Sequence, residues 1–299
     1  QNKDYEQAVD VLLAFRQQYP DHKLTKDIPS KLIVAYEDRG EWRNAAFELQ
    51  RIWKNGDDPE QQRIACYQSA EYFEKAGDTD NAIVMYKRYA HSYKRPFDAA
   101  IEAHFKLDQI YAAQGLEEKR RFWLDKIITL NSKAGDDATD RSRYLAARAA
   151  YDLGEFERVK FDSIALTLPL NKSITAKNTV MQKALKRYTQ AVKVGVLEYT
   201  TSSTYRIGEL YRQLATGLMD SERPAGLDEV ELEEYEFLLE DQAFPLEESA
   251  IDVHQTNTAR TYDGLYDQWI RKSYESMGLL MPGQYDKHER ALSYVEQIR

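Results

Sequence analysis

The stretch that decides the fold is YQSAEYFEKAGDTDNAIVMYKRY, residues 67–89. A single glycine, Gly77, separates two runs in which apolar residues recur every three or four positions. The apolar residues are Tyr67, Ala70 and Phe73 before the glycine and Ala82, Ile83, Tyr86 and Tyr89 after it. This spacing places them on one side of a helix, and glycine most easily takes the left-handed conformation that ends a helix. The stretch therefore predicts two helices that turn back on each other at Gly77.

The same arrangement recurs along the first half of the chain. Gly40, Gly77, Gly115 and Gly154 are separated by 37, 38 and 39 residues, and each stands between two apolar stripes. Small residues, Ala45 and Ala82, follow the first two glycines at the position where the helices of a pair would cross closely; Arg120 and Val159 replace them later. Repeats of this length are typical of helix-hairpin solenoids. We predict an all-α protein with helical repeats over residues 1–168 and irregular helices over 169–299.

Residues 74–82 and 5–20 resemble the tetratricopeptide repeat, whose unit is usually 34 residues long and is here longer by about three to five. The resemblance implies an α-α superhelix in which the first helices of successive pairs line a concave groove. It also disfavours the carboxylate clamp of chaperone-binding members, which uses Lys and Asn at positions held here by Ser30 and Val34.

The register of the repeat assigns candidate groove residues. The positions ten residues before Gly77, Gly115 and Gly154 are all aromatic, and aromatic side chains are enriched at binding hot spots. We predict a peptide- or protein-binding groove formed by Tyr67, Phe105 and Tyr144, with Glu71 and Arg148 beside them. The alternative is that these rings pack between helices.

A second candidate surface lies in the acidic segment Asp228–Asp241, which holds eight carboxylates and no basic residue. Interleaved apolar residues, Leu232, Tyr235, Leu238 and Leu239, predict an amphipathic helix with an acidic outer face. This face would dock a basic partner, such as a Lys-rich linker, through Glu229, Glu233, Glu236 and Glu240. The alternative is a solvated surface. Pro245 is expected to end or kink the helix, and a short final helix is expected at Ala291–Ile298.

Residues 233–269 resemble the C-terminal part of bacterial tetratricopeptide proteins linked to TonB transport systems and to gliding motility. The resemblance implies a periplasmic scaffold without catalytic residues. Three alternatives stay open: a cytoplasmic adaptor or regulator, a ligand-binding or enzymatic C-terminal half with a pocket joining Glu248, His254 and Tyr262, and a structural subunit of a filament or ring.

The composition excludes several classes of function. The 299 residues include 41 Lys and Arg against 50 Asp and Glu, with no basic cluster of the kind that binds nucleic acid. No apolar run is long enough to span a bilayer, and Cys66 is the single cysteine. Phosphate-binding loops, dinucleotide fingerprints, nucleophile elbows and paired metal-binding histidines are missing from the sequence. We expect a protein or peptide partner, no enzymatic activity, no cofactor and no metal.

Overall fold

The fold is all-α, as predicted. A computed structural model describes residues 2–286, which form thirteen α-helices and three short 3-10 helices and contain no strand. The chain divides into two compact units, Gln1–Leu145 and Ala146–Arg299, and the division falls inside α8 (Asp140–Ser163). The boundary expected at residue 168 lies in the loop after this helix. The helix expected at Ala291–Ile298 lies outside the described residues.

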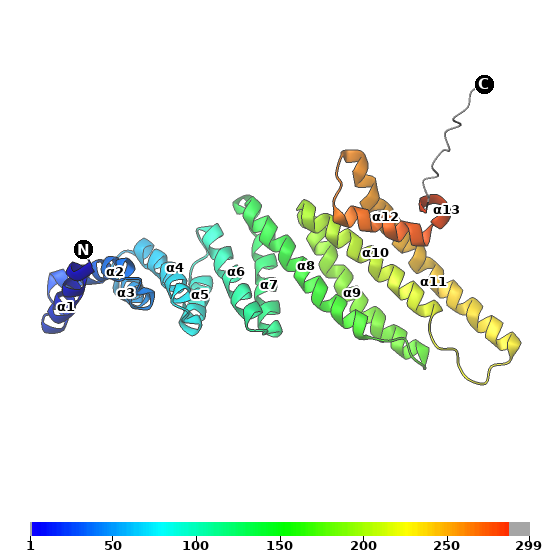
Figure 1. Ribbon diagram of the computed structural model, residues 1–299, viewed down its shortest axis with the longest axis horizontal. Coiled ribbons are helices and arrows are strands. Elements are labelled where there is room, and N and C mark those ends of the chain that lie inside the picture. Colours follow the sequence, from blue (N-terminus) through cyan, green and yellow to red (C-terminus); the bar gives the residue numbers. More distant parts are fainter. Residues whose placement is uncertain (1, 287–299) are drawn as a thin grey trace, which may run out of the picture. The chain divides into compact units, whose positions relative to one another are not determined.

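In the first unit each helix packs against the next one along the chain, which is the solenoid-like arrangement that the repeat predicts (Figure 1). Its elements are α1 (Asn2–Gln18), η1 (Lys23–Asp27), α2 (Ile28–Asp38), α3 (Trp42–Asn55), α4 (Pro59–Lys75), α5 (Thr79–Ser92), α6 (Phe97–Ala113), α7 (Glu117–Ser132) and η2 (Gly135–Asp137).

Three of the four marker glycines end a helix as predicted. Gly40, Gly77 and Gly115 have φ angles of +70°, +71° and +68° and follow α2, α4 and α6. After Gly77 the backbone N–H of Asp78 donates to the carbonyl of Phe73 at 2.9 Å, which satisfies one of the free carbonyls at the end of α4. A residue with a Cβ would be strained at these positions.

The prediction that Gly154 ends a helix is wrong. This glycine lies inside α8, which continues to Ser163. A Cβ built on Gly154 would lie 2.6 Å from Cε1 of Tyr188, a ring that is fully buried on α9 (Leu170–Val194). The glycine therefore allows the tyrosine ring to approach the helix backbone closely. The repeating pairs of helices joined at a glycine end before Gly154.

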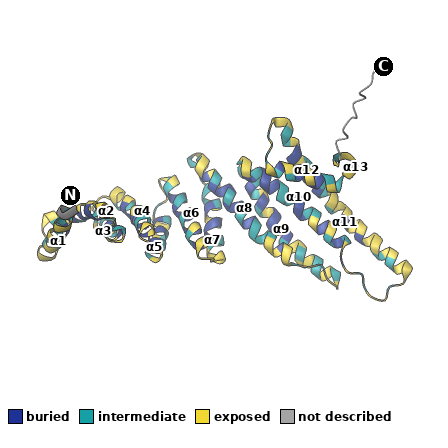
Figure 2. Ribbon diagram, in the orientation of Figure 1, coloured by how far each residue is buried: buried dark blue, intermediate teal, exposed yellow. Residues whose placement is uncertain are grey.

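The core of the first unit lies between the apolar stripes of neighbouring helices, where the sequence places it. Ala45, Ala82, Phe73 and Tyr86 are completely buried, and Figure 2 shows buried residues along the packed sides of these helices. Cys66 is buried in the same cluster. Burial raises the pKa of its thiol to about 12, so the thiol stays protonated and unreactive at neutral pH.

Arg120, which replaces the small residue of the earlier repeats, forms an ion pair instead of a close helix contact. Its Nε donates to Oδ1 of Asp108 at 2.9 Å, and Asp108 is 1% exposed. The pair joins α6 to α7 by a charge-assisted hydrogen bond at the position where earlier units have an alanine contact.

In the second unit α10 is central, because it packs against α9, α11 and α12. Besides the end of α8, the unit contains α9, α10 (Leu197–Met219), α11 (Glu229–Thr258), η3 (Ala259–Asp263), α12 (Gln268–Leu280) and α13 (Pro282–Tyr285). No helix in the described part of the chain is both long and apolar enough to cross a membrane.

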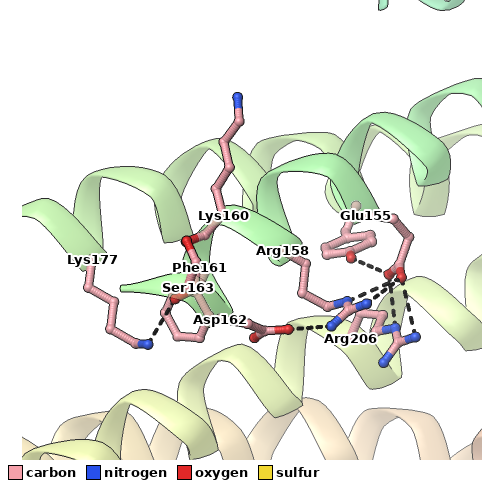
Figure 3. Close-up of polar contacts among 9 residues, drawn as sticks. Glu155, Arg158, Lys160, Phe161, Asp162, Ser163, Lys177 and Arg206 are labelled. Atoms are coloured by element: carbon pink, nitrogen blue, oxygen red, sulfur yellow. Dashed lines mark hydrogen bonds and ion pairs between the residues drawn. The ribbon is translucent and has the colours of Figure 1, made fainter. Parts of the chain in front are cut away.

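A cluster of charges ties α8, α9 and α10 together. Arg158 and Arg206 converge on the carboxylate of Glu155 (Figure 3), at 3.0 Å and 2.9 Å. The hydroxyl of Tyr188 donates to the same carboxylate at 2.5 Å. Burial opposes ionisation of Glu155, but the hydrogen bonds from Arg158 and Tyr188 outweigh it, so its pKa is lowered. Nearby, Lys177 donates to the carbonyls of Phe161 and Ile164 at the end of α8.

Candidate protein-binding surface

The helix α11 begins at a strong N-terminal cap. Oδ1 of Asp228 accepts from the backbone N–H of Glu231 at 2.9 Å, and Oε2 of Glu231 accepts from the N–H of Asp228 at 3.0 Å. This capping box satisfies free backbone donors, and the carboxylates of the first turn stabilise the positive end of the helix dipole. The acidic segment therefore forms a helix for a local reason.

One side of α11 is fixed to the rest of the unit. Leu239, Ala243, Ala250 and His254 are buried at successive spacings of four, seven and four residues, which place them on one side of the helix. Ala243 packs in a cluster with Ala215 and Leu218 of α10. The opposite side of the helix is therefore held facing outward.

Large apolar side chains occupy that outer side. Val230 is 65% exposed, Phe237 67% and Phe244 60%, and the three are seven residues apart, so they follow one another along the same side every two helical turns. Leu238 is 56% exposed next to them. Figure 2 shows the N-terminal half of α11 as mostly exposed. A contiguous exposed apolar patch of this kind usually marks an interaction site. We call Val230, Phe237, Leu238 and Phe244 the α11 stripe.

Carboxylates border the α11 stripe on the surface. A hollow of about 390 Å³ is lined by Val230, Phe237 and Leu238 together with Glu233 and Glu234. A second hollow of about 440 Å³ is lined by Phe237 and Phe244 together with the three carboxylates of Glu240, Asp241 and Glu247. No Lys or Arg of the described chain lines either hollow. The surface therefore combines an apolar centre with a negatively charged border.

The four glutamates that were predicted to dock a partner do not share one surface environment. Glu233 and Glu240 line the hollows beside Phe237. Glu236 lies 3.5 Å from Nε of Arg223, and Glu229 stands in the first turn of the helix. The predicted helix is present, but its outer side is not purely acidic: it carries the apolar α11 stripe, and Leu238 lies there rather than among the buried residues. The α11 stripe was not predicted, although the seven-residue spacing of Val230, Phe237 and Phe244 is visible in the sequence.

Pro245 does not end the helix. α11 is continuous from Glu229 to Thr258 with the proline inside it. The hydroxyl of Ser249 donates to the carbonyl of Pro245 at 2.8 Å. The contacts of α11 with α10 on both sides of the proline hold the helix together, because Ala243 and Ala250 are both buried.

The predicted groove residue Tyr67 contacts a neighbouring helix. Its ring centroid lies 5.8 Å from that of Tyr86 and 5.0 Å from that of Tyr89, both on α5 and both completely buried. Glu71, one turn further along α4, is half-buried, and burial raises its pKa. Part of Tyr67 stays accessible, so its contact with a partner remains a prediction.

The side chain of Arg141 lies over the rings of both Phe105 and Tyr144. The guanidinium of Arg141 lies 5.3 Å from the ring centroid of Phe105 and 5.8 Å from that of Tyr144. Its Nε donates to Oε1 of Glu102 at 2.5 Å. Phe105 is only 8% exposed under this cover, whereas Tyr144 is partly exposed. Arg148 lies in the second unit, where it pairs with Asp152. A role of these residues in binding a partner stays a prediction.

The residues of the alternative enzymatic site are not gathered together. His254 is completely buried, Tyr262 is 92% exposed and Glu248 is exposed. Among the described residues no group of three or more His, Cys, Asp or Glu side chains is placed to hold a metal ion.

No family model matches the chain, and no curated protein matches it.

Proposed function

We propose that the protein is a non-enzymatic scaffold that binds another protein through the α11 stripe and its acidic border. The observation that carries this proposal is the exposure of Val230, Phe237 and Phe244 in one line on a helix whose other side is buried. Removing such side chains from water is favourable by about 1.5–3 kcal/mol each. A partner that covers them gains this free energy.

The charges of the border select the chemistry of the partner. Five carboxylates line the two hollows, so the partner surface should carry Lys or Arg around apolar residues. A basic amphipathic helix meets both requirements, because its apolar residues recur at the spacing of the stripe. A second copy of α11 would bring like charges together, which is unfavourable.

The place of the protein in the cell is a proposal that comes from the resemblance of residues 233–269. We propose a periplasmic scaffold of a TonB-type or related envelope machine, with a Lys-rich linker as the kind of segment that α11 would bind. The alternative is a cytoplasmic adaptor. Fractionation of the source cells into periplasm and cytoplasm distinguishes the two.

Replacing Phe237 and Phe244 with serine is expected to weaken binding of a basic amphipathic helix by about tenfold or more, because each ring contributes buried apolar area. The probe is a synthetic helical peptide of leucine and lysine, measured by isothermal titration calorimetry. Binding should also weaken as salt is raised, since the charges of the border are exposed.

The matched control replaces Val159 and Leu279, which are 60% and 71% exposed elsewhere in the second unit, with serine. This variant should bind the peptide like the original chain. Equal weakening in both variants, or affinity that does not depend on salt, would contradict the proposal.

A further inference from the structure

A second surface with the opposite charge lies in the first unit. A cleft of about 500 Å³ opens where the ends of α5 and α7 meet the start of α6 and η2. We call it the α5–α7 cleft. Its apolar lining includes Phe97, Phe122, Trp123 and Leu130, and its basic lining includes Lys94, Arg95, Lys126 and Lys133.

The floor of the cleft is aromatic, and its central ring is buried among other rings. Trp123 is 4% exposed and packs edge-on against three rings. The centroid distances are 5.0 Å to Phe122, 5.3 Å to His104 and 6.0 Å to His91. The neighbouring Phe122 is 50% exposed, so its ring is available to an apolar group that enters the cleft.

Three of the four basic residues around this floor lack carboxylate partners among the described residues. The fourth, Arg95, pairs at 2.7 Å with Asp137, which also lines the cleft. Lys94, Lys126 and Lys133 are exposed and form no ion pair within residues 2–286. Nζ of Lys126 lies 5.3 Å from the ring centroid of Phe122, so positive charge and aromatic surface adjoin each other. Burial lowers the pKa of His104, so this ring adds no charge to the cleft at neutral pH.

We propose that the α5–α7 cleft binds an acidic peptide segment that carries an apolar side chain. The three unpaired ammonium groups attract carboxylates, and the ring of Phe122 offers contact area to a leucine or an aromatic residue. The volume of the cleft lies in the range of sites that enclose a few side chains. The basic partner proposed for α11 would be repelled here, so the chain has two surfaces that select partners of opposite charge.

The test uses a fluorescein-labelled synthetic peptide of alternating glutamate and leucine, with fluorescence anisotropy as the measurement. Changing Lys94 and Lys133 to glutamate is expected to weaken binding by about tenfold or more, because two attractive contacts become repulsive. The control changes Lys183 and Lys186, which are exposed on α9, to glutamate, so the net charge changes equally at another place. This control should bind within about twofold of the original chain.

The contribution of the floor is tested separately. A peptide of alternating glutamate and serine should bind the original chain more weakly by about fivefold or more. The Phe122→Ala variant should bind the leucine peptide more weakly by a similar factor. Any one of four outcomes would overturn the proposal. The serine peptide binds as tightly as the leucine peptide, the α9 control loses as much affinity as the cleft variant, citrate displaces the peptide as well as unlabelled peptide does, or the peptide does not bind at all. The variant F237S/F244S of α11 should bind this peptide unchanged, so the outcome is independent of the proposed function of α11.

Discussion

Replacing Glu209 with alanine is expected to lower the free energy of unfolding by about 3–5 kcal/mol. Glu209 is 7% exposed and lies where α10, α11 and α12 meet. Its carboxylate accepts hydrogen bonds from Ser276 at 2.7 Å and from Arg212 at 2.9 Å and 2.8 Å, and Nε2 of His254 lies 3.4 Å away. Alanine leaves the buried Ser276 and the partly buried Arg212 without their acceptor, and urea unfolding followed by circular dichroism measures the cost.

The matched control is Glu248→Ala. Glu248 is exposed on α11 and forms no ion pair with any described residue. Its replacement should change the free energy of unfolding by no more than about 0.5 kcal/mol. Similar losses in the two variants would show that the cluster around Glu209 contributes little to the packing of α11.

The charge of Glu209 also predicts a dependence on pH. Burial opposes its ionisation, but the adjacent His254 and the hydrogen bonds from Arg212 and Ser276 outweigh burial, so the pKa of Glu209 is lowered. A carboxylate with a lowered pKa stabilises the fold above its unfolded pKa of about 4.3, and this stability is lost as the pH falls through the folded pKa. Between about pH 5 and pH 2 the original chain should therefore lose more stability than Glu209→Gln. Parallel pH profiles of the two chains would contradict the assignment.

The sequence predicts the helical repeat of the first unit because the signals are local. A stripe of apolar residues and a glycine in the left-handed conformation belong to one helix end, as Gly40, Gly77 and Gly115 show. Gly154 has the same spacing but a different cause, because its partner Tyr188 lies on another helix. The spacing of glycines alone does not tell whether a turn or a close contact requires the missing side chain.

The candidate sites likewise include features that the local sequence predicts and features that depend on contacts between helices. The helix α11 and its carboxylates follow from the local sequence, and the seven-residue spacing of Val230, Phe237 and Phe244 would have predicted the line of apolar side chains. The position of Arg141 over the ring of Phe105 was not predictable, because Arg141 lies on a different helix, α8. The α5–α7 cleft likewise combines Lys94, which follows α5, with Phe122 and Lys133 of α7 and its end, so only the packed structure brings these charges and rings together.

Replacing Gly154 with alanine is expected to lower the free energy of unfolding by about 2 kcal/mol, although alanine favours helix formation over glycine by about 1 kcal/mol. The new Cβ would lie 2.6 Å and 2.7 Å from two carbons of the Tyr188 ring. That ring cannot move freely, because its hydroxyl donates to Glu155 and its faces are buried. The methyl group therefore has to displace α9 from α8, and the midpoint of urea unfolding measures the cost.

Gly278 on α12 provides the opposite expectation for the same substitution. It is also within a helix, but a Cβ there would meet no atom within 4 Å. Alanine should therefore raise the free energy of unfolding by about 0.5–1 kcal/mol, since only the helix propensity changes. If Gly154→Ala were as stabilising as Gly278→Ala, Tyr188 would have room to move, and the packing of α9 on α8 would have to be looser than the contact at Gly154 indicates.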